Sequence, residues 1–376
     1  MTSIPFGWSL KPLGEVATLQ RGFDLPVNQR NPGNIPVLAA NGQLGTHNIA
    51  KVKGPGVVTG RSGTLGEVHF VEDDYWPLNT ALWVKDFHGN DPKWIARLLK
   101  WMKLETYTRG TGVPTLNRNL IHVVPVLVPP LEEQRRIAAI LDKADAVRRK
   151  RKEAIALTEE LLRSAFLDMF GDPVRNSKNW DVVSLGHISR VQGGLQVTTK
   201  RNINPIEVPY LRVANVYRDK LVLDEVKLIR VTQQELERAI LNIGDLLIVE
   251  GHGNREEIGR SSVWDDSIPN CTHQNHLIRV RLDLKKAEPV YISAFLNSQG
   301  GRSQLTQFGK TTSGLNTIST SNVKSTKVLL PPLLLQKEYV KLKKNITDSK
   351  EYNYKYCQYS NSLFNSLLQR AFKGEL

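Results

Sequence analysis

The chain carries the same sequence pattern twice. Residues 8–22 read W-S-L-K-P-L-G-E-V-A-T-L-Q-R-G, and residues 180–194 read W-D-V-V-S-L-G-H-I-S-R-V-Q-G-G. At an offset of 172, the tryptophan, the Leu-Gly pair, the glutamine and the final glycine coincide. A second match, Pro-Pro-Leu-x-x-Gln, begins at Pro129 and at Pro331, and its offset of 202 continues to Phe170 and Phe372. A unit duplicated within one chain builds a pseudo-two-fold object, which suits a partner with two related sites.

The repeat predicts four segments. We expect globular blocks at residues 1–128 and 173–330, named block one and block two below, each followed by a long helix, at residues 129–172 and 331–376. The net charge is +14, of which block one carries +4 and block two +6. An excess of cationic side chains in the globular blocks favours a polyanionic partner held there, although a basic surface also serves solubility alone.

Several classes of protein do not fit the composition. The two cysteines provide neither a disulfide framework nor a zinc-site spacing. The first residues lack the basic and apolar regions of a signal peptide, and no apolar run approaches the length of a membrane span. We therefore expect a cytoplasmic protein without a membrane partner and without a metal of its own.

Two long segments have the character of helices. Residues 131–170 and 333–373 contain no glycine or proline, and Gly171 and Gly374 follow them as stop signals. Apolar residues recur at helical spacing near the ends of both segments, while the centres are polar. This pattern predicts an antiparallel coiled coil, in which each rod of forty residues is roughly 60 Å long. The basic run 148–152 is more typical of a solvated helix face than of a contact with DNA.

We expect ten residues of these segments to serve helix pairing or the docking of partner subunits. They are Leu131, Gln134, Ile137, Leu141, Leu161, Leu333, Gln336, Tyr339, Leu342 and Leu363.

The two blocks repeat one scheme of strands and helices. Short strand-like runs come first, a helix follows at about residues 92–103 in block one and 290–297 in block two, and a strand closes each block. Because the helices come late in each block, the pattern favours the α+β class, with two tandem blocks of mixed helix and strand, over a doubly wound sheet.

The turns of both blocks are rich in side chains that can hydrogen-bond to base edges. Arg and Lys suit guanine, Asn and Gln suit adenine, and Ser or Thr fit either, although the same residue types also simply make turns. As candidate DNA-binding residues we take Asn41, Gln43, Arg61, Thr64, Arg109, Thr111 and Arg118 in block one, and Asn254, Arg255, His273, Gln274, Lys310 and Thr312 in block two.

No catalytic motif is found. Gly309-Lys310-Thr311 suggests a phosphate loop, but the motif needs glycine at position 304, where Gln304 stands. The Asn/Asp-Pro-Pro-aromatic signature of amino-methyltransferases is missing, and no Ser-His-Asp set is present in order or context. The sequence predicts a recognition protein that has no catalytic residues.

The duplicated Pro-Pro-Leu-x-x-Gln helices and the Trp-x-x-x-x-Leu-Gly starts at Trp8 and Trp180 resemble the specificity subunit of type I restriction-modification enzymes. The resemblance implies that each block is a target-recognition domain for one half of a bipartite, asymmetric site in double-stranded DNA. It implies paired helices that dock two modification subunits, which use S-adenosylmethionine to methylate adenine N6 after flipping the base. Restriction subunits would add ATP-driven translocation and Mg²⁺-dependent cleavage.

Two alternatives stay open at this point. The chain could be a stand-alone methyltransferase or nuclease, which the missing motifs disfavour, or a coiled-coil adaptor that binds only protein, which the basic blocks disfavour. The second helix has Leu334-Leu335 where the first has Glu132-Glu133, so the two helices need not dock partners equally.

Overall fold

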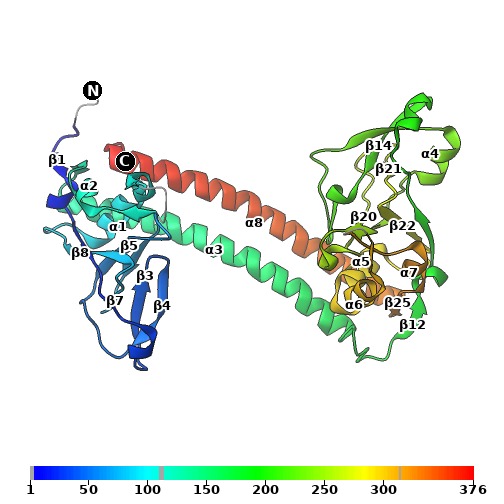
Figure 1. Cartoon of the computed structure of the whole chain (residues 1–376), viewed down its shortest axis with the longest axis horizontal. Coiled ribbons are helices and arrows are strands. Elements are labelled where there is room, and N and C mark those ends of the chain that lie inside the picture. The colour runs from blue at the N-terminus through cyan, green and yellow to red at the C-terminus, as the bar shows by residue number, and fades with distance from the viewer. Residues whose placement is uncertain (1–3, 110–113, 313–314) are drawn as a thin grey trace. The chain divides into compact units, whose positions relative to one another are not determined.

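The computed structural model describes residues 4–109, 114–312 and 315–376 (Figure 1). It divides into two compact units. Unit 1 contains Met1–Ile155 and Tyr352–Leu376, and unit 2 contains Ala156–Glu351. Each unit therefore holds one globular block together with part of each long helix, α3 (Leu131–Phe170) and α8 (Leu333–Lys373).

Block one is built on a four-stranded antiparallel sheet of order β2-β8-β5-β6, beside a three-stranded sheet of order β4-β3-β7. Two ribbons, β1-β11 and β9-β10, complete it. The elements are β1 (Ser9–Pro12), β2 (Thr18–Arg21), β3 (Ile35–Ala39), β4 (Gly42–His47), β5 (Gly56–Gly60), β6 (Val68–Val71), β7 (Trp76–Pro77), β8 (Ala81–Asp86), α1 (Pro92–Trp101), β9 (Thr108–Arg109), β10 (Thr115–Leu116), α2 (Arg118–His122) and β11 (Pro125–Val128).

Block two repeats this architecture, with sheets of order β13-β22-β18-β20 and β17-β14-β21 and a ribbon β12-β25. Its elements are β12 (Asp181–Ser184), β13 (Ser189–Gly193), β14 (Ile206–Leu211), β15 (Val216–Tyr217), β16 (Lys220–Leu221), β17 (Lys227–Val231), α4 (Gln233–Ala239), β18 (Leu246–Val249), β19 (Gly251–His252), β20 (Ser261–Val263), β21 (Thr272–His273), β22 (Leu277–Leu282), α5 (Pro289–Asn297), α6 (Gln299–Phe308), β23 (Lys310–Thr312), β24 (Leu315–Thr317), α7 (Thr320–Ser325) and β25 (Lys327–Leu330). The predicted α+β class is confirmed.

The helix that follows each sheet begins where the sequence predicts. Asp91 caps α1 by accepting a hydrogen bond from the backbone N–H of Trp94 at 2.9 Å, and a proline occupies the first turn. The repeat-equivalent helix α5 also begins with a proline, Pro289. Block two continues into a second helix, α6, which the sequence did not predict and where block one has only a 3-10 turn at Leu104–Tyr107.

The glutamine of the Pro-Pro-Leu-x-x-Gln motif fastens each long helix to its own block. The Gln134 side chain accepts from the backbone N–H of Asp91 at 2.9 Å and donates to the carbonyl of Pro129 at 2.9 Å. The Gln336 side chain makes the same pair of bonds, accepting from the N–H of Glu288 at 2.9 Å and donating to the carbonyl of Pro331 at 2.8 Å. Both glutamines are buried, so these bonds satisfy backbone groups that water does not reach.

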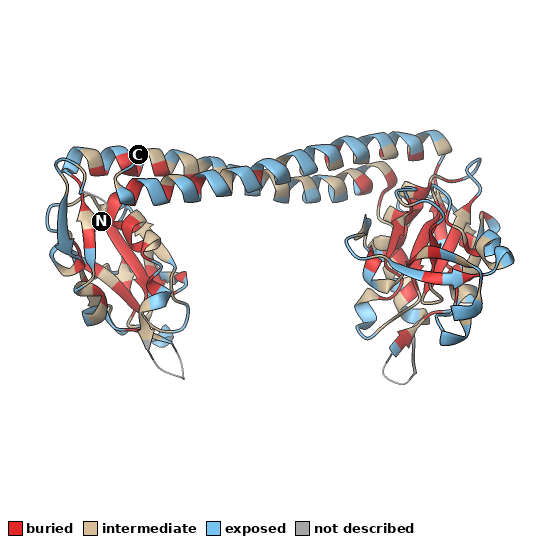
Figure 2. Cartoon of the chain, turned by 90° about the horizontal axis from the view of Figure 1, so that it is seen from above, coloured by how far each residue is buried: buried red, intermediate tan, exposed pale blue. Residues whose placement is uncertain are grey.

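The two long helices pair antiparallel, as the sequence predicts. In unit 1, Ile137 and Leu141 near the start of α3 share a core with Phe364 and Leu368 near the end of α8. In unit 2, the rings of Phe166 and Phe170 at the end of α3 lie 5.6 and 5.3 Å from that of Tyr339 near the start of α8. Figure 2 shows the buried strands of the blocks and the buried residues near the ends of both helices.

The compact units differ from the four segments expected from the sequence, because each helix joins the core of both units. Each helix starts on its own block and ends on the core of the other unit. The segment boundaries remain a prediction about where each recognition domain begins and ends.

Candidate nucleic-acid interface

In block one, four segments meet where the central strand β5 ends. Leu116 of β10 donates its backbone N–H to the carbonyl of Arg61 at 2.8 Å, and Arg61 donates its own N–H to the carbonyl of Thr80 at 2.9 Å. A Cβ added to Gly60 would lie 3.4 Å from the Cβ of Ala40, so the turn after β3 approaches the same point. Residues 39–42, 60–66 and 78–80, with the described residues 108–109 and 114–116 of the β9-β10 ribbon, form this assembly, named the block-one loop cluster below.

Block two builds the same assembly from equivalent segments. Ile318, just after β24, donates its backbone N–H to the carbonyl of Glu250 at 2.9 Å, and Glu250 donates to the carbonyl of His276 at 2.9 Å. Gln274 donates to the carbonyl of Leu211, the last residue of β14, at 2.8 Å. Residues 211–215, 250–257 and 274–276, with the described residues 310–312 and 315–318 of β23, β24 and the turn after it, form the block-two loop cluster.

A repeated glycine allows the edge of each sheet to approach its loop cluster. A Cβ added to Gly22 would lie 2.3 Å from the carbonyl oxygen of Leu78, and one added to Gly194 would lie 2.3 Å from the carbonyl oxygens of His273 and Gln274. Real Cβ atoms do not approach backbone oxygens so closely, so only glycine fits at either position. This contact explains why the glycine that ends the first repeated motif is present in both copies.

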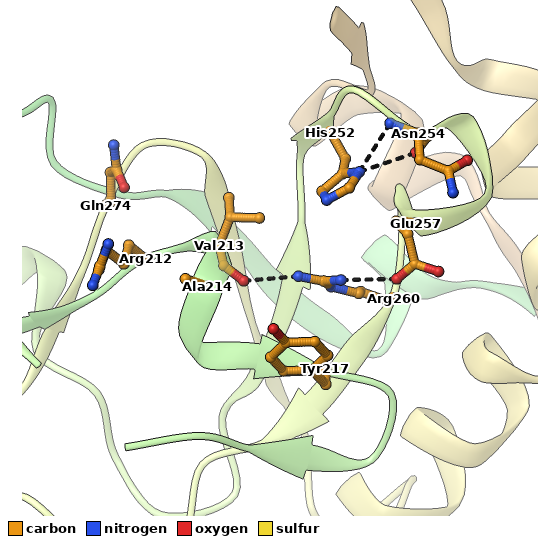
Figure 3. A pocket seen from close by; sticks show the side chains of 9 residues that line it. All are labelled: Arg212, Val213, Ala214, Tyr217, His252, Asn254, Glu257, Arg260 and Gln274. Atoms are coloured by element: carbon orange, nitrogen blue, oxygen red, sulfur yellow. Dashed lines mark hydrogen bonds and ion pairs between the residues drawn. The ribbon is translucent and has the colours of Figure 1, made fainter. Parts of the chain in front are cut away.

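The block-two loop cluster contains a polar depression of about 710 Å³ (Figure 3). It is lined by Arg212, Val213, Ala214, Tyr217, His252, Asn254, Glu257, Arg260 and Gln274. Arg212 and Gln274 lie on one side, with His252 and Asn254 on the other. Arginine and the two amides are the side chains that pair bidentately with guanine and adenine, so the lining suits the edges of DNA bases.

The floor of the depression is held rigid by a buried guanidinium. Arg260 donates to the Glu257 carboxylate at 2.8 Å and to the carbonyl of Val213 at 2.9 Å, and its guanidinium lies 4.5 Å from the ring centroid of Tyr217. The hydrogen bond from Arg260 is the largest cause of the lowered pKa of Glu257, with a further bond from Arg218, so this carboxylate stays ionised and paired. Tyr217 itself is 44% exposed, and a positioned, exposed ring can stack on a base or a sugar.

Three of the candidate DNA-binding residues in block one, Asn41, Arg61 and Thr64, lie in the loop cluster. Gln43 is exposed on β4, where its amide is directed to the carbonyl of Gly45 at 3.4 Å, and Arg118 is exposed in the first turn of α2. The backbone of Arg109 belongs to β9, within the cluster. Thr111 lies outside the described residues.

In block two, Asn254 and Gln274 line the depression. Arg255 is exposed beside them and donates to the carbonyl of Thr306 at 3.1 Å. Lys310 and Thr312 contribute their backbones to β23, within the cluster.

The prediction that His273 contacts DNA is corrected by its burial. The side chain is fully buried, and its Nδ1 atom lies 3.2 Å from the carbonyl oxygen of Ala239. Burial, reinforced by the nearby Arg279, lowers the pKa of His273 to about 4, so the ring is neutral at physiological pH. His273 is a core residue, and its neighbour Gln274 is the one that reaches the surface of the cluster.

Sequence reasoning did not identify Arg212, Tyr217, His252 and Arg260 as site residues. No local motif marks them, because they come from three separated segments that only the sheet brings together. The usable signal was the repeat itself. Arg212 follows the last residue of β14, and the equivalent end of β3 leads into the turn that contains the candidate residue Asn41.

The ten helix residues divide by exposure. Ile137, Leu141 and Tyr339 are buried in the cores of their units, as helix pairing requires. Gln134 and Gln336 are also buried, and their role in docking a partner is corrected to the fastening described above. Five others can face a partner: Leu131, Leu161, Leu342 and Leu363, which are exposed, and Leu333, which is half-buried.

Within the described ranges, no group of three or more His, Cys, Asp and Glu side chains is arranged to hold a metal ion. Across the same ranges, no helix combines the length and the apolar character that a membrane span requires.

Comparison with known proteins places the chain in a family. The model for the type I restriction modification DNA specificity domain matches residues 5–157 and 177–357. The specificity subunit of the type I restriction enzyme EcoKI from Escherichia coli (strain K12) is 25% identical, with 99% of this chain and 90% of that protein covered. The StySPI specificity subunit from Salmonella potsdam is 23% identical over the same shares.

Solved structures share the fold. The S subunit of a type I restriction-modification system from M. genitalium superposes with a TM-score of 0.64 at 13% identity, covering 99% of this chain and 98% of that one. A chain from a structure of complex assembly and conformational transition in the type I R-M system gives 0.58 at 17% identity, with both chains fully covered.

Proposed function

We propose a function on the basis that this chain belongs to the family of type I restriction-modification DNA specificity proteins. Its loop clusters read DNA, each block taking one half of a bipartite, asymmetric site. The observation that carries this proposal is that one loop cluster is built twice, on the same strands and by the same backbone hydrogen bonds, in blocks that carry charges of +4 and +6. Cationic blocks attract the phosphate backbone of any DNA, and the amide and guanidinium groups of the clusters supply sequence preference.

The chemistry belongs to other polypeptides under this proposal. Two modification subunits supply S-adenosylmethionine and methylate adenine N6, and restriction subunits supply ATP-driven translocation and Mg²⁺-dependent cleavage. The chain itself is the non-catalytic subunit that directs them, in the cytoplasm where the DNA is accessible.

The long helices carry surfaces that suit two copies of one partner. Leu157 and Leu161 of α3 are 62% and 52% exposed, and at the repeat offset of 202 they correspond to Tyr359 and Leu363 of α8, which are 59% and 58% exposed. Large apolar side chains left in water at equivalent places in both halves are typical of interface residues. We assign these two pairs to the docking of the two modification subunits.

The decisive experiment maps methylated adenines in DNA treated with the chain together with its modification subunit. We expect methylation at one bipartite sequence only, and we expect the pure chain to bind DNA weakly, with an affinity that falls steeply as salt rises. The complex without the chain is the control and should show no such preference. Methylation without sequence preference, or methyl transfer or cleavage by the pure chain alone, contradicts the proposal.

A further inference from the structure

Residues Arg61 and Glu250 occupy the same place in the two blocks. In block one, Gln20 pairs with Trp83, which pairs in turn with Val58 on the next strand. In block two, the repeat-equivalent Gln192 pairs with Arg279, which pairs in turn with Leu247. Counting from this register, Gly60 at the end of β5 corresponds to Val249 at the end of β18. The next residue is Arg61 in block one and Glu250 in block two.

The backbone contacts of these two residues confirm the equivalence. The carbonyl of Arg61 accepts from Leu116 at 2.8 Å, and the carbonyl of Glu250 accepts from Ile318 at 2.9 Å. Leu116 and Ile318 are themselves separated by the repeat offset of 202. Each loop cluster therefore presents residue 61 or 250 from the same backbone position.

The two side chains have opposite chemistry. Arg61 donates from Nη1 to the carbonyl of Asn79 at 3.1 Å and is half-buried, and a guanidinium has five N–H donors, so this one bond leaves donors for a ligand. Glu250 has a side chain that is 28% exposed, and its Oε2 lies 3.6 Å from Nδ1 of His276. Partial burial raises the pKa of Glu250, which marks a carboxylate already drawn out of water.

A carboxylate at a surface that binds DNA weakens the attraction to phosphates and so lowers the overall affinity. Its useful role at such a surface is therefore to distinguish one base from another. Among base edges in the major groove, it can accept a hydrogen bond from the exocyclic amino group of cytosine or adenine, whereas it repels the acceptor atoms of guanine and thymine. A guanidinium has the reverse preference and pairs with the O6 and N7 acceptors of guanine.

We infer that positions 61 and 250 set opposite base preferences in the two half-sites. Arg61 selects guanine in the half-site of block one, and Glu250 selects a base with an exocyclic amino group, cytosine or adenine, in the half-site of block two. This inference rests on the proposed function, since it assumes that the loop clusters face DNA.

If this is correct, the charges of the two residues have opposite effects on the affinity for unrelated DNA. Removing the Arg61 charge weakens binding to unrelated DNA, because a cation near phosphates is lost. Removing the Glu250 charge strengthens binding to unrelated DNA, because an anion near phosphates is lost. A residue with a purely structural role would not improve binding when it is removed.

The test compares Arg61→Ala and Glu250→Ala in the full chain assembled with its modification subunit. Each variant is assayed for methylation across a library of DNA sites and for affinity to a non-cognate duplex. We expect Arg61→Ala to lose roughly tenfold to hundredfold discrimination at one position of block one's half-site, and Glu250→Ala to lose a similar factor at one position of block two's half-site. Non-cognate affinity should fall for the first and rise for the second.

Conservative variants refine the assignment. Arg61→Lys keeps the charge but not the planar fork, so it should restore non-cognate affinity in full and the guanine preference only in part. Glu250→Gln is nearly isosteric and tests the site if the alanine variant unfolds. It should keep the preference if the base is adenine, which an amide can also bind, and lose it if the base is cytosine. Lys85→Gln, near the end of β8, and Lys285→Gln, in the turn after β22, change exposed lysines at or beyond the strand ends that lead away from the loop clusters. They are the matched controls and should leave both half-sites unchanged.

The outcomes separate this inference from the proposed function. A wild-type complex without sequence preference overturns the proposed function. A wild-type complex that is specific, together with a Glu250→Ala variant that keeps the block-two half-site or binds all DNA more weakly, overturns only the inference.

Discussion

At the residue scale, the central sheet of block two carries a buried charge at a position where that of block one carries an aromatic ring. Arg281 pairs bidentately with the buried Asp245, with both N–H···O distances at 2.7 Å, and the buried Arg279 donates to the carbonyl of Ile240 at 2.7 Å. The strand position of Arg279 is held in block one by Trp83. A buried charge that loses its partner is strongly destabilising, so the stability of block two depends on keeping these partners together.

His273 makes the stability of block two depend on pH. Its pKa is about 4 in the folded chain and 6.5 in the unfolded chain, because burial and the nearby Arg279 disfavour the charged ring. Unfolding therefore takes up a proton between these values, so this contribution to stability is complete above pH 6.5 and is lost as the pH falls toward 4. We expect His273 to remove about 2 kcal/mol from the free energy of unfolding between pH 7 and pH 5.

The measurement is denaturant unfolding of the wild type and of His273→Asn at both pH values. The variant does not titrate at this position, so its loss of stability should be smaller than that of the wild type by the amount attributed to His273. Equal losses in the two proteins would mean that the ring does not stay neutral in the folded chain.

At the scale of elements, α3 and α8 attach to the blocks through shared residues but contact each other through different ones. The glutamine and the terminal phenylalanine are shared: Gln134 corresponds to Gln336, and Phe170 to Phe372. The polar links along the helices differ, since α3 and α8 are joined in unit 2 by the ion pair of Lys350 and Glu159, and in unit 1 by the Arg151 guanidinium on the ring of Tyr356. The shared residues fix where the helices attach, and the others are free to vary.

The exposed apolar pairs on these helices should affect assembly and not folding. We expect Leu157→Ser/Leu161→Ser and Tyr359→Ser/Leu363→Ser each to weaken the binding of one modification subunit, because about 0.8 kcal/mol of burial is lost for each methylene removed from an interface. The stoichiometry should fall from two subunits to one, measured by mass photometry or sedimentation. The controls are Glu160→Ser and Gln369→Ser, which replace exposed polar residues on the same helices. Undiminished binding of two subunits by both double variants would exclude these surfaces.

At the scale of the whole molecule, the two units contain the same kinds of elements, a globular block and part of each long helix. They differ in how the chain supplies these elements. Unit 2 is one continuous segment, whereas unit 1 is completed by the end of α8. Phe364, Leu368 and Phe372 join the core of unit 1, and the ring of Phe372 stacks on Trp101 with centroids 5.3 Å apart. Unit 1 therefore cannot form its core until the last residues of the chain are available.

Fragments should reproduce this difference. We expect residues 156–351 to unfold cooperatively as a separate protein, and residues 1–155 to do so only when a peptide of residues 352–376 is added, because burial of the three large side chains provides several kcal/mol. Circular dichroism during thermal unfolding measures both. A peptide with Phe364→Ala and Phe372→Ala is the matched control and should fail to restore cooperativity. Full cooperativity of residues 1–155 alone would show that α8 is dispensable.

The sequence by itself determined the features that repeat. The two blocks, the long helices, their antiparallel pairing and the family resemblance all follow from motifs whose residues are close together in the chain, such as Gln134 three residues into α3 or Gly171 directly after it. Local chemistry dictates such features, because caps, stops and apolar stripes act over one or two helical turns.

Only the tertiary structure decided which residues form the candidate interface. Arg212, His252 and Gln274 come together because separate strands end at one edge, and the burial of His273 beside the reachable Gln274 depends on strand pairing. Residue types in loops do not distinguish these cases, since turns and base contacts use the same side chains. The correspondence of Arg61 and Glu250 likewise comes from the register of the strands. Sequence comparison of the two blocks does not reveal it, because the two residues differ in type.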